Sequence, residues 1–239
     1  MSTNTGDATA TLAVNELFGP TFQGEGPNQG RLARFIRLFG CHLTCEWCDT
    51  PQTWDRRRHD LTAEQQQLGV ADILNWLADS PGGLVVITGG EPLLQQRALE
   101  PLLAAINQSD LAAEIEVETS GTIAPSAAVV EAVTRFSVSP KLAHSTLLER
   151  QRLRPAALRQ FVLSGKAHWK FVVQSMKDLD EVEHLVAQYR LDPVWIMPEG
   201  TDSTTVLDRM RLLADPVLAR GWNLTSRLHI LLWENARAR

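Results

Sequence analysis

Residues 40–50 read GCHLTCEWCDT, and this stretch contains all three cysteines of the 239-residue chain, Cys41, Cys45 and Cys48. Three thiolates on one short loop can hold three corners of a four-iron cluster and leave the fourth iron open to a substrate or cosubstrate. A structural zinc site normally requires four ligands, and His42 follows Cys41 too closely for both to reach one tetrahedral ion. A disulfide would leave one thiol unpaired. The pattern favours an iron–sulfur cluster over the alternatives of a zinc site or three unrelated buried cysteines.

The rest of the composition indicates a single α/β domain over residues 11–239, preceded by a disordered tail at residues 1–10. The formal charge is −5, and the interspersed charges favour neither nucleic acid nor an anionic membrane as a partner. The basic run Arg56-Arg57-Arg58-His59 is typical of a solvated loop, with an anion patch as the alternative. No apolar run approaches the ~18 residues of a membrane span. The absence of an export signal, together with thiols suited to metal binding, predicts a cytoplasmic protein.

Short apolar runs alternate with amphipathic stretches along the chain, as in repeated strand–helix–strand units with a parallel sheet. Strands are predicted at residues 33–38, 84–88, 114–118, 136–139, 169–173, 194–197 and 227–233. Helices are predicted at residues 62–79, 93–107, 125–134, 178–189 and 203–219, with a less regular segment before residue 169. About six such units are too few to close an eight-stranded barrel. The expected fold is therefore a partial, open βα barrel of about six parallel strands.

Polar residues and glycines follow several predicted strands directly. They occur at residues 88–91 (TGGE), 118–121 (ETSG), 139–141 (SPK) and 198–200 (PEG). Each segment alone is equally typical of a tight turn. Together they favour a ligand-binding rim, because parallel α/β sheets place their sites at the carboxyl ends of the strands. Gly89-Gly90 is expected to let backbone amides approach a ligand.

The cysteine spacing, followed by GGEP at residues 89–92, resembles the radical S-adenosylmethionine family. The resemblance implies that the amino and carboxylate groups of S-adenosylmethionine chelate the open iron of a [4Fe-4S] cluster. It also implies that one electron from the cluster cleaves the sulfonium to a 5′-deoxyadenosyl radical, and it implies the same open-barrel fold.

A second set of motifs resembles a narrower family, the 7-carboxy-7-deazaguanine synthases, from about residue 14 to residue 229. These motifs are NELF (15–18), TFQGEG (21–26), IRLFGC (36–41), CDT (48–50), TGGEP (88–92), ETSG (118–121), SPK (139–141) and MPEG (197–200). The resemblance implies a radical ring contraction of 6-carboxy-5,6,7,8-tetrahydropterin to 7-carboxy-7-deazaguanine with loss of ammonia, in queuosine and 7-deazapurine biosynthesis. It further implies a lyase that uses Mg²⁺, receives electrons from a donor such as flavodoxin or ferredoxin, and forms a homodimer.

Residue roles follow from the resemblance position by position. The cluster ligands, which are also the catalytic residues, are Cys41, Cys45 and Cys48, and the magnesium ligand is Thr50, whose alternative role is to cap a turn. The substrate-binding residues are Phe22, Gln23, Gly24, Glu25, Arg37, Thr88 and His229. The S-adenosylmethionine-binding residues are Gly90, Glu118, Ser139, Pro140, Lys141, Met197, Pro198, Glu199 and Gly200.

Some interpretations stay open at this point. His229 could instead be a hydrogen-bonded core histidine on an inner strand. A glycyl-radical-enzyme activase and a non-catalytic zinc-binding module are the alternative functions. The family often continues beyond the last motif with glycine and a Lys-Arg pair, whereas residues 234–239 here read ENARAR. No site residue is therefore assigned beyond His229.

The first prediction tests the cluster. Cys45→Ala should abolish both the iron–sulfur centre and S-adenosylmethionine cleavage, because two thiolates cannot hold a four-iron cluster with one open site. Iron and sulfide content and 5′-deoxyadenosine formation are measured after anaerobic reconstitution. Substantial cleavage by this variant would contradict the radical interpretation.

Overall fold

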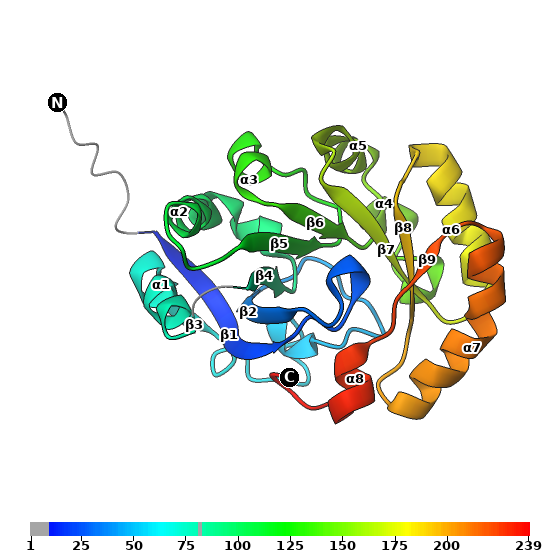
Figure 1. The fold of residues 1–239 in the computed structure, drawn as a ribbon, viewed down its shortest axis with the longest axis horizontal. Helices are drawn as coiled ribbons and strands as arrows, with labels where there is room; N and C mark the ends of the chain where they lie inside the picture. Colours follow the sequence, from blue (N-terminus) through cyan, green and yellow to red (C-terminus); the bar gives the residue numbers. More distant parts are fainter. Residues whose placement is uncertain (1–9, 81–82) are drawn as a thin grey trace.

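The computed structural model describes residues 10–80 and 83–239, and the predicted disordered tail lies outside these ranges except for Ala10. One sheet of nine strands forms the centre of the described part of the chain (Figure 1). The strands are β1 (Thr11–Phe22), β2 (Leu32–Leu38), β3 (Gln66–Gly69), β4 (Leu84–Gly89), β5 (Glu114–Thr119), β6 (Arg135–Val138), β7 (Ala167–Val173), β8 (Val194–Pro198) and β9 (Asn223–Leu224).

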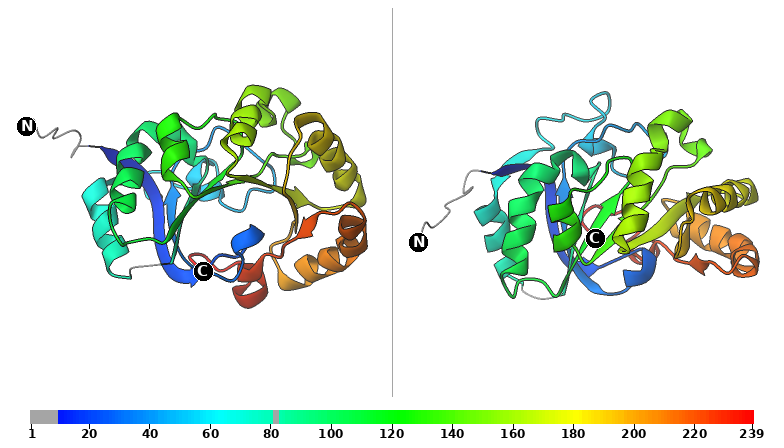
Figure 2. Two further views of the ribbon diagram at one scale, coloured as in Figure 1. Left: turned by 45° about the horizontal axis from the view of Figure 1, so that its top comes forward. Right: turned by 90° about the horizontal axis from the view of Figure 1, so that it is seen from above.

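The strand order is β3-β1-β2-β4-β5-β6-β7-β8-β9. Pairing is parallel from β2 to β9, whereas β1 pairs antiparallel with both β2 and β3. The sheet curves into an open arch whose first and last strands do not pair with each other (Figure 2). This arrangement confirms the predicted open βα barrel.

Helices cover the convex side of the arch, and the C-terminal end of the chain lies on its concave side (Figure 2). The α-helices are α1 (Val70–Ala78), α2 (Gln96–Asn107), α3 (Ala127–Ala132), α4 (Glu149–Arg152), α5 (Pro155–Ser164), α6 (Met176–Tyr189), α7 (Ser203–Ala219) and α8 (Leu228–Trp233). Short 3₁₀ turns are η1 (Gly26–Asn28), η2 (Pro51–Thr53), η3 (Pro92–Gln95) and η4 (Ala143–Ser145).

Strand β4 is buried on both faces, as its continuous apolar run predicts. Val85 and Ile87 belong to the main core between sheet and helices. Leu84 and Val86 face the other way and pack with Phe18, Phe35 and Ala33 in a smaller cluster. Neighbouring side chains of a strand point to opposite faces of the sheet. Strand β4 therefore packs against the helices on one face and against the smaller apolar cluster on the other.

The helix predicted over residues 62–79 is wrong in its first half. Residues 66–69 form β3, which pairs with residues 11–14 of β1, and the helix begins only at Val70. The Gly69 N–H donates to the Asp72 carboxylate (2.9 Å), so the capping group is Asp72 and not Thr62. A pairing partner about 50 residues earlier overrides the local helical pattern, which periodicity within one window cannot show.

The strand predicted over residues 227–233 is also wrong, because Leu228–Trp233 form helix α8 and the last strand is the two-residue β9. A short apolar run fits a buried strand and a short helix equally well. No strand was predicted at β1 or β9, and α4 and α5 lie in the segment before residue 169 that was predicted to be less regular. No helix within the described ranges is long and apolar enough to cross a membrane.

The second prediction tests the main core between the sheet and the helices. Leu103 on α2 is fully buried in the main core, so Leu103→Ala should lower the free energy of unfolding by about 2–5 kcal/mol. Leu218→Ala, at a position 72% exposed on α7, is the matched control and should change it by less than about 0.5 kcal/mol. Urea unfolding followed by circular dichroism measures both, and equal effects would contradict this assignment of the core.

Candidate active site

A row of polar side chains crosses the carboxyl end of the sheet in register. Glu16 on β1 pairs with Arg37 on β2, and Arg37 pairs with Thr88 on β4. Thr88 donates a 2.7 Å hydrogen bond to Glu118 on β5, which in turn pairs with Ser137 on β6. This register brings side chains as far apart in sequence as residues 16 and 137 onto one wall.

The cysteine loop lies beside this wall and is fastened to it by backbone bonds. The Gly40 N–H donates to the Thr53 carbonyl (3.0 Å), and the Glu91 N–H donates to the Gly40 carbonyl (2.9 Å). The three thiols are free and line the same cavity, with Cys45 the most buried. Burial raises the pKa of the Cys41 thiol to about 12, so a bound cation is needed to hold it as a thiolate.

Gly89 and Gly90 serve close packing. Gly89 has a φ of +147°, and a Cβ there would lie 2.8 Å from the Leu38 nitrogen. A Cβ on Gly90 would lie 2.6 Å from the Cys41 Cβ. The Gly90 N–H donates to the Leu38 carbonyl (3.3 Å) and the Glu91 N–H donates to the Gly40 carbonyl (2.9 Å), so both amides already have backbone partners. The approach of the Gly89-Gly90 segment to a ligand stays a prediction.

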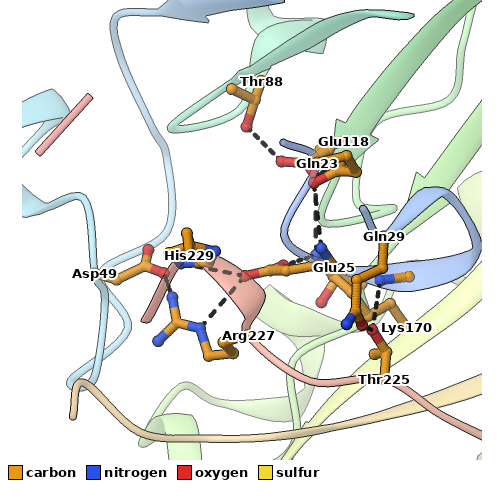
Figure 3. A network of polar contacts seen from close by, with 12 residues as sticks. Gln23, Glu25, Gln29, Asp49, Thr88, Glu118, Lys170, Thr225, Arg227 and His229 are labelled. Carbon is orange, nitrogen blue, oxygen red and sulfur yellow. Dashed lines mark hydrogen bonds and ion pairs between the residues drawn. The ribbon is translucent and has the colours of Figure 1, made fainter. Parts of the chain in front are cut away.

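A second wall is a buried network of charges centred on Glu25 (Figure 3). Lys170 on β7 forms an ion pair with Glu25, and the Arg227 Nε lies 3.3 Å from a Glu25 oxygen. Arg227 also forms an ion pair with Asp49 beside the third cysteine and donates to the Gly200 carbonyl (2.6 Å). The network thereby ties β7, the cysteine loop and the C-terminal segment to the TFQGEG segment.

The positive and negative side chains of this network keep one another ionised. Burial opposes ionisation of Glu25, but the positive charges of Lys170 and Arg227 outweigh it and hold the pKa of Glu25 well below its usual range. Burial by itself would lower the pKa of Lys170, yet Glu25 and Glu118 raise it above its usual value. Glu25 therefore presents an ionised carboxylate that can accept N–H donors from a ligand.

Gln23 links two carboxylates below the cavity. Its side-chain amide donates to Glu118 (3.2 Å) and to Glu116 (3.0 Å), and Asn28 also donates to Glu116. Burial and the neighbouring charge of Glu118 raise the pKa of Glu116 to about 7. The amide of Gln23 is thereby held in place, and Glu118 is bonded by both Gln23 and Thr88.

His229 lies on α8 and lines the cavity. A Cβ on Gly24 would overlap the His229 ring. The absence of a side chain at Gly24 therefore leaves the space that the imidazole occupies. Its Nε2 lies 4.0 Å from Glu25, and burial lowers its pKa, which favours the neutral ring. His229 thus faces the cavity and is neither on a strand nor in the core.

The guanidinium of Arg37 is held on one side and available to a ligand on the other. Its Nε donates to Glu16 (3.2 Å) and its guanidinium lies over the Phe18 ring (5.3 Å), so the side chain is held in one orientation. Within residues 10–80 and 83–239, no side chain or carbonyl bonds its two terminal nitrogens. Those two donors can grip a carboxylate in a bidentate manner.

The cavity enclosed by these walls has a volume of about 480 Å³. All but three of the predicted site residues line it, the exceptions being Pro140, Pro198 and Gly200. Sequence reasoning missed several lining residues, among them Asp49, Lys170, Arg227, Trp47 and Trp54. A lysine in the mostly apolar strand β7 was the one available signal for Lys170. Residues 235–239 also line the cavity, and Arg237 forms ion pairs with Glu16 and Glu64.

The surroundings of the cysteine sulfurs bear on how a metal centre would be held. In the described part of the chain, no group of three Cys, His, Asp or Glu side chains is placed to hold a single ion. The Trp54 indole N–H donates to the Cys48 sulfur (3.3 Å), the kind of outer contact that orients a ligand and tunes its centre.

The Thr50 hydroxyl is free to act as a ligand. Its backbone carbonyl accepts from Thr53 (3.1 Å), but no side-chain bond caps the η2 turn. The one contact of the hydroxyl within the described ranges is a weak one, 3.8 Å from the Cys48 sulfur. The alternative role of Thr50 as a capping side chain is therefore not observed.

Comparisons with known proteins agree with this geometry. Residues 22–140 match the family of 4Fe-4S single cluster domains. A 7-carboxy-7-deazaguanine synthase of Pyrobaculum aerophilum is 37% identical over 97% of this chain and 99% of its own length. One of Halobacterium salinarum is 34% identical over 98% and 95%, respectively.

Among solved structures, QueE from Escherichia coli matches with a TM-score of 0.66 and 28% identity, over 92% of this chain and 95% of its own. Streptococcus suis SuiB bound to precursor peptide SuiA matches with a TM-score of 0.53 and 18% identity, over 80% of this chain and 47% of its own. The likeness to SuiB shows a shared fold alone.

The third prediction concerns the bond from Trp54 to Cys48. Trp54→Phe removes an N–H donor that stabilises negative charge on the sulfur, and a reduced cluster carries more of that charge. A difference of about 1 kcal/mol corresponds to about 40 mV for one electron, so the reduction potential should fall by that order. An EPR-monitored redox titration of the reconstituted protein measures it.

Trp47→Phe is the matched control, because the Trp47 indole N–H has no hydrogen-bond partner within the described residues. Its reduction potential should stay near that of the parent protein. Equal potentials for Trp54→Phe and the parent would show that the contact with Cys48 does not tune the centre.

Proposed function

The chain belongs to the 7-carboxy-7-deazaguanine synthase family, and from this premise we propose how its cavity carries out that activity. The substrate is 6-carboxy-5,6,7,8-tetrahydropterin, and the reaction is a ring contraction with release of ammonia, which makes the enzyme a lyase. The observation that carries the proposal is the shared cavity, in which three cysteines of one loop face a free guanidinium and two carboxylates.

The cofactors are an iron–sulfur cluster and S-adenosylmethionine, as the 4Fe-4S domain match and the radical S-adenosylmethionine relatives support. Cys41, Cys45 and Cys48 would hold the cluster. When bound, the two cofactors together supply an adenosyl radical for hydrogen abstraction from the substrate. Gly90, Glu118, Ser139, Lys141, Met197 and Glu199 line the part of the cavity assigned to S-adenosylmethionine. Lys141 is oriented there by its bond to Ser139 (3.2 Å) and by the Trp47 ring below it (5.5 Å).

The substrate is held between the two walls. Arg37 donates to the substrate carboxylate through its two free nitrogens. Glu25 accepts N–H donors from the pterin ring, and its buried ion pair with Lys170 prevents the carboxylate from turning away. Holding a reactant in one orientation supplies much of the rate enhancement that positioning can give.

Thr50 would hold a magnesium ion beside the same carboxylate. A hydroxyl oxygen suits a hard cation that keeps most of its waters and takes its other ligands from substrate. The ion would orient the carboxylate and stabilise charge as the ring rearranges. This assignment is supported by the free Thr50 hydroxyl at the edge of the cavity.

Three further parts of the proposal concern the surroundings of the enzyme. We propose that it is cytoplasmic, that it forms a homodimer, and that a protein electron donor such as flavodoxin or ferredoxin reduces it. The test of the activity is anaerobic turnover of the pterin with dithionite as reductant, with 7-carboxy-7-deazaguanine detected by mass spectrometry. Transfer of hydrogen from a glycine of a partner protein, without pterin turnover, would instead indicate an activase.

The fourth prediction separates substrate binding from cluster assembly. Arg37→Leu should lower catalytic efficiency roughly ten- to hundred-fold, because a lost charge-assisted contact costs about 1.5–3 kcal/mol. Thr50→Val keeps the shape but removes the oxygen ligand, so it should weaken the response of the rate to added Mg²⁺. Neither change removes a cysteine, and the contact of Thr50 with the Cys48 sulfur is a weak one of 3.8 Å, so both variants should assemble the cluster and bind S-adenosylmethionine.

The measurement is the rate of product formation over a magnesium titration, with iron content checked in parallel. An unchanged magnesium response in fully loaded Thr50→Val would show that Thr50 is a turn residue only. Normal efficiency in Arg37→Leu would remove the guanidinium from the substrate site.

A further inference from the structure

The loop after the cysteine motif carries three consecutive arginines, Arg56, Arg57 and Arg58, all exposed. Arg58 forms an ion pair with Asp55 (2.5 Å). The side chains of Arg56 and Arg57 form no hydrogen bond or ion pair with any residue in the described ranges. None of the three lines the substrate cavity, so the proposed reaction gives them no role.

The turn that carries the arginines is held by several hydrogen bonds around Asp55. Asp55 is 9% exposed, and its carboxylate accepts from the Arg57 N–H (3.0 Å) as well as from Arg58. The Asp55 N–H donates to the Pro51 carbonyl (2.7 Å), and the His59 N–H donates to the Asp55 carbonyl (3.1 Å). A buried aspartate thus holds the turn in a form that leaves the arginines exposed.

The same turn is joined directly to the cysteine loop. Trp54 lies between Asp55 and Thr53, and its indole N–H touches the Cys48 sulfur (3.3 Å). Thr53 is fully buried and bonds the Gly40 N–H through its carbonyl (3.0 Å). Only one residue, Asp55, separates this contact with a cluster ligand from the exposed Arg56.

The charge of this loop contrasts with that of the whole molecule. The chain has a formal net charge of −5, so the molecule as a whole repels an acidic protein. The three arginines would attract the same protein at this loop. A surface of this kind both steers an acidic partner and fixes where it lands. The partner that a cluster beside the surface requires is one that delivers an electron.

We propose that Arg56, Arg57 and Arg58 form the docking surface for a small acidic one-electron carrier protein. In the docked complex the carrier is oxidised by one electron and the cluster is reduced by one, with no proton or group transferred. This inference rests on the proposed function, because it requires a redox cluster on Cys41, Cys45 and Cys48.

The test compares Arg56→Glu/Arg57→Glu with the parent holoenzyme. Stopped-flow absorbance measures the second-order rate of cluster reduction by reduced flavodoxin, a small acidic carrier, at low and high ionic strength. The rate of the parent should fall as salt increases, because salt screens exposed charges. The double variant should be at least about ten-fold slower at low salt and nearly independent of salt, since steering of this kind raises association rates by 10–10³.

Three controls make the result specific. Arg56→Lys/Arg57→Lys keeps the charge and should keep the rate. Arg159→Glu, an equivalent change at an exposed position on α5, should have less effect than the single variant Arg57→Glu. Reduction by dithionite, and turnover with dithionite, should be the same in all variants, since a small reductant needs no docking surface.

Equal rates with flavodoxin in the parent and in Arg56→Glu/Arg57→Glu would overturn the docking surface, as would equal losses in Arg57→Glu and Arg159→Glu. Failure of the proposed function gives a different result, namely no pterin turnover with dithionite in the parent protein. Binding of oxidised flavodoxin to the cluster-free chain, measured calorimetrically at low salt, provides a readout that does not require a loaded cluster. Undiminished binding by the double variant would also overturn the proposal.

Discussion

The close backbone contact between Gly89-Gly90 and residues 38–41 is the constraint on which the site depends. Parallel pairing of β2 with β4 brings the two strand ends together, and side chains at residues 89 and 90 would collide with Leu38 and Cys41. The cysteine loop is therefore placed by the sheet, and the bond from Glu91 to Gly40 holds it there. Since the same register aligns Arg37 with Thr88, one pairing sets the position of the cluster ligands and of the substrate wall.

The buried ion pairs around Glu25 fix the orientation of its carboxylate, and removing these charges from water costs free energy. Removing ions from water is expensive, and a buried pair often contributes little net stability compared with apolar side chains of the same shape. What the pairs with Lys170 and Arg227 provide is a carboxylate with fixed charge and direction. Groups fixed before the substrate arrives need not reorganise during the reaction, and this is how preorganised electrostatics stabilise charge that develops in a transition state.

The parts of the site that follow strands could be predicted from sequence, and the parts set by tertiary contacts could not. Thr88, Glu118 and Ser139 were predictable because each lies at the carboxyl end of a predicted strand and parallel strands end at one edge. Lys170 and Arg227 were not, because only the folded chain shows that they meet at Glu25. The helix α8 was mistaken for a strand because its apolar run has no distinguishing period, yet His229 still reaches the cavity. Gly90 was predicted to be in the site from ligand access alone, and only the folded chain shows that packing against Cys41 also requires a glycine there.

The cysteine loop has to satisfy two opposing requirements, which are exclusion of water from the cavity and access for an electron donor. Radical chemistry requires a cavity that excludes water, whereas delivery of an electron requires that the cluster lie near the protein surface. Asp49 and Thr50, directly after the last cysteine, line the cavity, and Asp49 forms an ion pair with Arg227 on the substrate side. Trp54, which also lines the cavity, and Asp55 connect Cys48 to an exposed turn a few residues later. Between them and Thr50 lies the η2 turn at Pro51–Thr53, whose buried Thr53 anchors the chain to Gly40. A short turn thus lets one loop form part of an enclosed cavity on one side and reach solvent on the other.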